Sequence, residues 1–151
     1  MKIYGIFNKK TLLPAMLAVC LFALTAVFTA KSCFVQKNAD GVSERRAFLS
    51  NLGISADTDT EQHKTVLIPD NFGAVYENYN MLQKAAGFDL SLYKGCTVTL
   101  YTYQVTSGDR VRYNANLLVY NGRVIGGDLS SAALDGQMVP LIKKEIKKCL
   151  K

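Results

Sequence analysis

Histidine is nearly absent from this 151-residue sequence, because His63 is the only one. A serine or cysteine nucleophile activated by histidine would need that one side chain, and no Gly-x-Ser-x-Gly motif accompanies it. Zinc ligands are scarce as well, because outside residues 11–30 the chain has only His63 and three cysteines. No phosphate-binding glycine loop and no dinucleotide-binding motif is present either. The sequence therefore does not support these catalytic and nucleotide-binding classes.

A basic central region is also lacking, although the net charge of the whole chain is +6. Residues 1–30 contribute +3 and residues 143–151 contribute +4, whereas residues 31–142 hold ten Lys and Arg against eleven Asp and Glu. A nucleic-acid-binding domain is expected to concentrate basic charge on the domain itself. The charge distribution therefore predicts no nucleic-acid partner.

Cysteine is scarce, and no Cys-x-x-Cys pair suggests a metal or redox site. Cys20 lies within an apolar stretch, which leaves Cys33, Cys96 and Cys149 as an odd number elsewhere. One disulfide with a remaining free thiol, or three unpaired cysteines of the kind often buried in protein cores, are both compatible with this spacing. The spacing does not assign a pairing.

Charge is absent from residues 11–30, whose sequence is TLLPAMLAVCLFALTAVFTA. At about 1.5 Å per helical residue, twenty such residues span the hydrocarbon core of a bilayer. Lys2, Lys9 and Lys10 precede this run, and lysines in this position keep that end of a chain in the cytoplasm. We therefore expect residues 1–10 to be a cytoplasmic basic leader, residues 11–30 to contact the lipid bilayer as a transmembrane segment, and the remainder to lie outside.

Two alternatives remain for residues 11–30. A cleaved signal peptide has a similar charged start, and Ala30-Lys31-Ser32 is an acceptable cleavage site, but the apolar core is longer than the usual 7–15 residues. The protein would then be secreted. A lipid anchor at Cys33 is the weaker alternative, because Lys31 and Ser32 precede it in place of small apolar residues.

The remaining residues suffice for one domain with a real core. We expect a tether over 31–41, an extracytoplasmic α+β domain over 42–142 and a basic tail over 143–151. The predicted fold is a transmembrane or signal helix followed by a small α+β domain, in which one or two helices pack on an antiparallel three-stranded meander.

Two helices are predicted within this domain. The first covers 44–52, with Ser43 as its N-cap and Gly53 after its end. The second covers 71–86, with Asp70 as its N-cap and Gly87 after its end. Its apolar face is expected to hold Phe72, Val75, Tyr76, Tyr79 and Leu82.

The stretch between these helices is expected to be mostly loop, with a short edge strand over 65–68 that ends at Pro69. Asp57, Asp59 and Glu61 resemble the start of a calcium-binding loop. Gln62 stands where such a loop needs glycine and Ile68 where it needs glutamate, so a solvated loop is the preferred interpretation.

Three strands are predicted over 96–106, 110–120 and 123–130. Asn121-Gly122 between alternating strands is a strong hairpin signal, because both central residues of a type I′ turn need positive φ. The register predicted from the turns pairs Tyr120 with Arg123 and Thr106 with Arg110. Uninterrupted pairing would turn Asp128 inward, so we expect a bulge at Gly126-Gly127 that returns Leu129 to the core face.

Asp128 and Asp135 are the carboxylates most suited to acid–base chemistry, because Gly126-Gly127 leaves open backbone beside Asp128. Each also has an ordinary structural explanation, Asp128 as the end of a bulged strand and Asp135 as a turn residue before Gly136. The Lys-rich tail predicts a short amphipathic helix after Pro140, able to lie on anionic lipid or to end the domain in solvent.

Three blocks of sequence, over 75–84, 87–95 and 116–128, resemble the family described as domain of unknown function 4830. Its members are short proteins of Gram-positive bacteria that begin with a hydrophobic segment. The resemblance covers about Val42 to Leu141. It implies one extracytoplasmic α+β domain and assigns no activity, substrate or catalytic residue, and the basic tail lies beyond it.

The expected function is that of a membrane-anchored extracytoplasmic domain that binds an envelope ligand or protein without catalysing a reaction. The alternatives are a small envelope enzyme using Asp128 and Asp135, and a membrane-surface adaptor that acts through residues 143–151. The sequence assigns no catalytic, cofactor-binding or metal-binding residue, and no cofactor.

Overall fold

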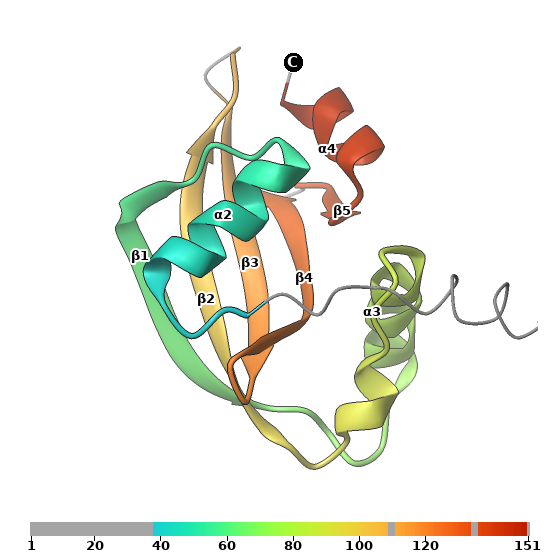
Figure 1. Cartoon of the computed structure of the whole chain (residues 1–151). Helices are drawn as coiled ribbons and strands as arrows, with labels where there is room; N and C mark the ends of the chain where they lie inside the picture. Colours follow the sequence, from blue (N-terminus) through green and yellow to red (C-terminus); the bar gives the residue numbers. More distant parts are fainter. Residues whose placement is uncertain (1–37, 109–110, 134–135, 151) are drawn as a thin grey trace, which may run out of the picture. The chain divides into compact units, whose positions relative to one another are not determined.

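The computed structural model describes residues 38–108, 111–133 and 136–150 (Figure 1). The predicted leader, the predicted membrane segment, most of the predicted tether and Asp135 lie outside these residues. Within the described part, no helix combines the length and the apolar character needed to cross a membrane. All described residues belong to one compact unit, Gln36–Lys151.

The described elements follow one another along the chain as α2 (Val42–Leu52), β1 (Asp57–Leu67), α3 (Ala74–Ala85), the 3-10 helix η1 (Leu90–Tyr93), β2 (Thr97–Thr106), β3 (Arg112–Tyr120), β4 (Arg123–Ser131), β5 (Met138–Pro140) and α4 (Lys143–Cys149). In the described part of the chain, the strands form one antiparallel sheet in the order β1-β2-β3-β4-β5. The α+β class is confirmed. The predicted meander of three strands is wrong in number, because β1 and β5 extend it at its two edges.

Strand β1 occupies a polar stretch that was expected to be largely loop. It pairs with β2 from Gln62 to Leu67 in regular register, with an irregularity between Asp57 and Gln62. Its side chains are mostly exposed because it lies at the sheet edge. A strand at the edge of a sheet is held by backbone hydrogen bonds to one neighbour, and its side chains can remain in solvent. Such a strand can therefore be polar throughout and lack the apolar alternation that identifies strands in a sequence.

The β2–β3 pairing differs from the predicted register by two residues. Thr106 lies opposite Arg112, and the connection includes the hydrogen bond from Ser107 N to Val111 O at 3.0 Å. A shift of two residues preserves the face of every side chain, because side chains alternate with a period of two. The predicted apolar face is therefore correct although the predicted partners are wrong.

The β3–β4 hairpin confirms both local predictions. Asn121 and Gly122 have φ angles of 46° and 70°, as a type I′ turn requires. The register shifts between Leu118 and Val119, so that Leu129 lies opposite Ala115 and is fully buried. The predicted bulge is therefore present, but its extra residue is Ile125, directly before the predicted Gly126-Gly127.

The sheet buries a hydrophobic cluster on each face, and Figure 1 shows the helices that cover them. On one face, Leu49 of α2 and Ile146 of α4 pack with residues that include Tyr103, Leu117 and Leu129. On the other face, the loop before α3, α3 and η1 cover a second cluster, whose members include Ile68, Leu90, Val98, Leu118 and Ile125. Sequence patterning identified the first face clearly. The second is apolar over only part of its length.

Helix α2 begins after Gly41 and not after Ser43, whose hydroxyl donates to Glu44 and does not cap the helix. Gly53 ends the helix with φ 87°, as predicted. The end of the predicted tether lies against the domain. Ala39 is fully buried, and its N–H donates to Gly122 O at 2.7 Å.

Helix α3 begins after Gly73, so the predicted cap at Asp70 is wrong. Its predicted apolar face is correct only in part. Val75 is 84% exposed, whereas Asn80 and Gln83 are buried. This face of the helix meets backbone polar groups as well as side chains, and buried amides can satisfy such groups where apolar residues cannot.

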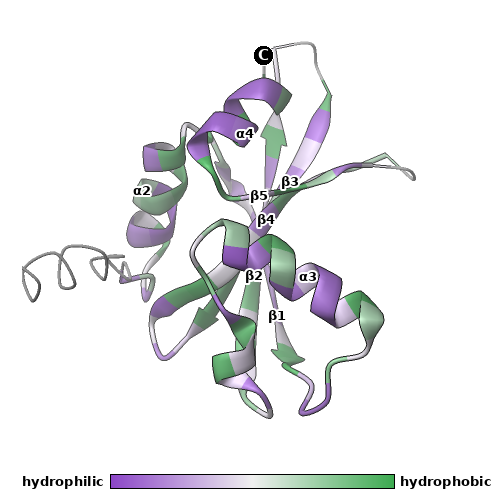
Figure 2. Cartoon of the chain, turned by 90° about the vertical axis from the view of Figure 1, so that its right-hand side faces the viewer, coloured by the Kyte–Doolittle hydropathy of each residue, from purple (hydrophilic) through white to green (hydrophobic). Residues whose placement is uncertain are grey.

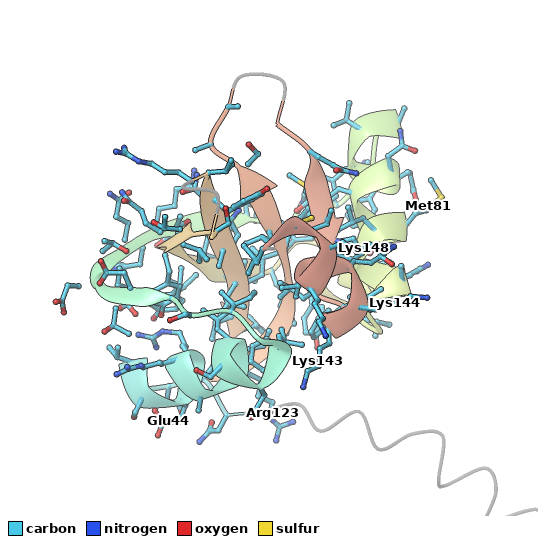
Figure 3. All side chains as sticks on the ribbon, turned by 90° about the horizontal axis from the view of Figure 1, so that it is seen from above. Glu44, Met81, Arg123, Lys143, Lys144 and Lys148 are labelled. Atoms are coloured by element: carbon cyan, nitrogen blue, oxygen red, sulfur yellow. The ribbon has the colours of Figure 1, made fainter. Side chains whose placement is uncertain are left out.

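Helix α4 uses the apolar side of the Lys-rich tail within the domain. Ile146 is 1% exposed, and Cys149 and Leu150 pack against the same cluster. The lysines remain outside, and Figure 2 shows the helix as mostly hydrophilic. Figure 3 shows Lys143, Lys144 and Lys148 projecting from it.

Candidate functional site

A row of polar side chains crosses the sheet on the face that α3 partly covers. Thr102 of β2 lies opposite Asn116 of β3, which lies opposite Asp128 of β4. Directly opposed side chains are close enough to bond across strands. Thr102 Oγ1 donates to Asn116 Oδ1 at 2.8 Å, and Asn116 Nδ2 donates to Asp128 Oδ1 at 2.8 Å. We call Thr102, Asn116 and Asp128 the polar ladder.

Tyr79 of α3 closes the end of the polar ladder, since its hydroxyl donates to Asp128 Oδ2 at 2.9 Å. Asp128 is only 2% exposed. Its burial raises the pKa of the carboxyl group, and the hydrogen bonds from Asn116 and Tyr79 oppose this rise. Burial, together with the charge of Asp128, also raises the pKa of the Tyr79 hydroxyl. Tyr79 therefore stays a hydrogen-bond donor at neutral pH.

Gly126 and Gly127 allow α3 to approach β4. Gln83 Oε1 accepts a hydrogen bond from Gly127 N at 2.7 Å, beside the bulge that interrupts the strand pairing. A Cβ atom on Gly126 would lie 2.9 Å from Gln83 Oε1 and 3.1 Å from Leu90 Cδ2. The glycines therefore leave room for Gln83 to satisfy a backbone group of the bulged strand. This contact helps to position Tyr79 over Asp128.

An open groove of about 640 Å³ lies beside the polar ladder, within the size range of small-molecule sites. Its apolar lining consists of Val66, Leu67, Leu100, Leu118 and Met138, with Tyr76 and Tyr79 as aromatic members. Its polar lining consists of the polar ladder with Gln62, His63, Lys64 and Asn114. The groove thus combines an apolar wall with convergent polar groups.

The structure separates the other residues considered from the sequence. Exposed His63 lies on β1, with its ring centroid 5.9 Å from that of Tyr101. Glu61 pairs with Arg45, whereas Asp57 Oδ1 accepts from Asp59 N at 3.0 Å. Among the described residues, no three or more His, Cys, Asp or Glu are grouped so that they could hold a metal ion.

The structure also locates two of the cysteines and one of the two candidate carboxylates. Cys96 and Cys149 are free thiols, and Cys33 lies outside the described residues. Of the two candidate carboxylates, Asp128 lies in the groove, while Asp135 also lies outside the described part.

Sequence reasoning missed Thr102, Asn116 and Gln83 as site residues, and placed Tyr79 on the apolar face of its helix. A signal existed for the polar ladder, because Thr102, Asn116 and Asp128 all lie in strands on the face opposite the first core. No local signal could align them, since the alignment depends on the β2–β3 register and on the bulge in β4.

A second buried polar cluster surrounds Arg45 of α2, which is 3% exposed. Its guanidinium pairs with Glu61 at 2.9 Å and donates to Tyr103 Oη at 2.8 Å and to the carbonyl oxygens of Ala39 and Asp40. The Tyr103 hydroxyl also donates to Glu61. Because each guanidinium nitrogen is already engaged, we interpret this cluster as structural and not as a ligand site.

A protein-family model described as domain of unknown function (DUF4830) matches residues 48–129. No curated protein and no solved structure matches the chain. The matched span includes α3 and the whole polar ladder, and ends before β5 and α4.

Proposed function

This chain belongs to the DUF4830 family, whose description gives no activity, and we propose that it is a non-enzymatic module that binds a ligand in the groove. One observation carries the proposal. The buried Asp128 carboxylate, fixed by Asn116 and Tyr79, lines a groove with an apolar wall. Prearranged polar groups beside apolar surface are typical of binding sites.

Binding is favoured over catalysis by the chemistry of the groove lining. Among its described residues, Asp128 is the single carboxylate, and both of its oxygens already accept hydrogen bonds. Tyr79 holds its proton more tightly than a free tyrosine does. General acid–base catalysis needs groups that exchange protons near the working pH. An envelope enzyme that uses Asp128 with Asp135 is the alternative.

A groove-filling variant tests the proposal. Asn114 lines the groove, is half-buried and lies on a strand, where an aromatic side chain is tolerated. We expect small molecules that bind the full-length chain in ligand-observed NMR to lose binding to Asn114→Trp and to keep it with Thr106→Trp, an exposed strand position outside the lining. Equal binding to both variants, or chemical turnover of a bound compound, would contradict the proposal.

We also propose that residues 11–30 anchor this domain outside the cytoplasmic membrane. The support is the uncharged twenty-residue run and the lysines before it. Recovery of full-length chain in the membrane fraction, with an intact mass that includes residues 1–30 and protease access from outside, is the expected result. A mass that lacks the first thirty residues would indicate cleavage and secretion.

The membrane-surface adaptor is supported by the exposed lysines of α4. Because Ile146 already packs in the domain core, lipid contact would be electrostatic and not by insertion. For such an adaptor, binding of anionic vesicles should weaken with added salt and disappear when the α4 lysines are changed to Gln.

A further inference from the structure

The hydrogen-bond donors of the polar ladder are all in use. The Thr102 hydroxyl donates to Asn116, and the Asn116 amide donates to Asp128 Oδ1 at 2.8 Å and to Ser130 Oγ at 3.2 Å. The Tyr79 hydroxyl donates to Asp128. A hydroxyl has one proton, an amide nitrogen has two and an ionised carboxylate has none. The ladder therefore offers only acceptor lone pairs to a ligand.

The hydrogen bonds also favour a negative charge on the ladder, because both oxygens of Asp128 accept from donors, as those of an ionised carboxylate do. Asp128 is 2% exposed and forms no salt bridge with a described Lys or Arg. Taking an ionised carboxylate out of water without an opposite charge is unfavourable. A cation in the groove would interact with this charge in surroundings that screen it less than bulk water does.

The rest of the lining suits an apolar stem. Tyr76, Leu100 and Leu118 lie on the lining beside the half-exposed Thr102 and Asn116. An aromatic ring beside an acceptor-rich site also favours a cation over a neutral group. The donors of the lining outside the ladder belong to residues that include Gln62, Lys64 and Asn114.

From these observations we infer that the groove binds an organic cation, a primary ammonium or guanidinium group on an apolar stem. The inference rests on the proposed binding function and names its ligand class. The cationic group donates to free lone pairs of Thr102 and Asn116, and the charge of Asp128 attracts it from the neighbouring strand. The stem lies along Tyr76, Leu100 and Leu118.

Lys64 allows the sign of the ligand's charge to be tested. It is exposed and is the one Lys or Arg among the described lining residues. Its charge opposes a bound cation, although water screens it more than it screens the buried Asp128. Removing the Lys64 charge should strengthen cation binding, whereas removing the Asp128 charge should weaken it.

The experiment uses matched probes that differ in charge. Nα-acetyl-lysine methylamide and Nα-acetyl-arginine methylamide are titrated calorimetrically into the full-length chain in detergent, beside their neutral analogues with norleucine and citrulline. We expect each cation to bind about tenfold more tightly than its neutral analogue, as for one hydrogen bond to a charged group.

The variants separate this inference from the proposed function. Asp128→Asn should remove the preference for the cation, and Lys64→Gln should raise cation affinity by about twofold. Asn114→Trp should abolish binding of every probe. Equal affinity for cationic and neutral probes that Asn114→Trp abolishes would overturn the cation inference and leave the groove as a binding site. Absence of binding by all probes would overturn the inference itself.

Discussion

Two buried charged side chains of this domain have opposite surroundings. The guanidinium of Arg45 pairs with Glu61 and lies 3.8 Å from the ring centroid of Tyr101. Asp128 accepts hydrogen bonds from neutral groups and has no salt-bridge partner among the described residues. Paired charge can be accommodated in a protein interior, whereas unpaired charge raises the pKa of an acid. The first arrangement supports the fold, and the second leaves the charge of Asp128 without an opposite charge among the described residues.

Replacing Arg45 tests the structural role of its cluster. Arg45→Met should reduce the free energy of unfolding by about 3–5 kcal/mol, because the Glu61 carboxylate and the carbonyl oxygens of Ala39 and Asp40 would lose the guanidinium. Urea denaturation followed by circular dichroism measures this loss. The neighbouring Arg46 is exposed, so Arg46→Met should change the stability by no more than about 0.5 kcal/mol. Similar losses for both variants would show that the cluster does not stabilise the fold.

Asp128 predicts a pH dependence of stability. Its pKa is raised in the folded state, so between the unfolded and folded pKa values the native protein binds more protons than the unfolded chain does. This group therefore lowers the free energy of unfolding as the pH rises from about 4 through its folded pKa. Asp128→Asn keeps the shape of the side chain and should remove this contribution.

The measurement compares the two proteins, because other carboxyl groups titrate in the same range. The stability of Asp128→Asn minus that of the parent, from urea denaturation between pH 3 and pH 8, should increase with pH. A difference that is constant across this range would contradict a raised pKa for Asp128.

At the scale of secondary-structure elements, α3 is attached to β4 by a polar contact as well as by apolar packing. Gln83 accepts from the Gly127 N–H beside the bulge, and Tyr79, one helical turn earlier, contacts Asp128. The bulge and the two glycines let the Gln83 side chain reach the backbone of β4. The position of α3, and with it that of Tyr79, is thus linked to the polar ladder.

Alanine substitutions at the two glycines should differ in severity. A Cβ on Gly127 would collide with the backbone oxygen of Asn116, whereas a Cβ on Gly126 would meet the side chains of Gln83 and Leu90. Backbone in a paired strand cannot move as side chains can, so Gly127→Ala should cost about 3 kcal/mol and Gly126→Ala about 1 kcal/mol. Thermal denaturation ranks the two variants. The opposite ranking would contradict the close approach at Gly127.

At the scale of the whole described domain, one sheet separates two cores. Helices α2 and α4 cover one core and α3 with η1 covers the other. The family match ends at residue 129, yet Val139 of β5 and Ile146 of α4 are buried in the first core. The C-terminal segment therefore completes the domain in this chain.

Ile146 tests this role of α4. Ile146→Ala should lower the free energy of unfolding by about 2–4 kcal/mol, because it removes a fully buried side chain and leaves a cavity. The adjacent exposed Lys147→Ala should change stability by less than about 0.5 kcal/mol. Chemical denaturation of both variants gives the comparison. A small effect at Ile146 would mean that α4 contributes little to the core.

Local backbone chemistry was predictable from the sequence at several positions. Gly53, Asn121 and Gly122 all have positive φ where helix-end and turn rules placed them, because these conformations depend on the residue itself. The bulge beside Gly126-Gly127 was predictable because Leu129 had to reach the core face. The class of the domain followed from the same patterns.

Other features depended on contacts between distant residues. Strand β1 carries no apolar alternation and exists because β2 offers a paired edge. Asn80 and Gln83 are buried on α3 although helical patterning expects apolar residues there.

The sequence by itself determined the Asn121-Gly122 turn, the glycine that ends the first helix, the need for a bulge in β4 and the α+β class, because each depends on neighbouring residues or on a period of two. The anchoring of residues 11–30 stays a prediction from the sequence. The tertiary structure alone decided that Thr102, Asn116 and Asp128 form one row beneath Tyr79. Their alignment depends on the register of β2 against β3, which differs from the predicted register by two residues, and on the docking of α3. Both are set by contacts between residues far apart in the sequence, which short-range sequence rules do not include.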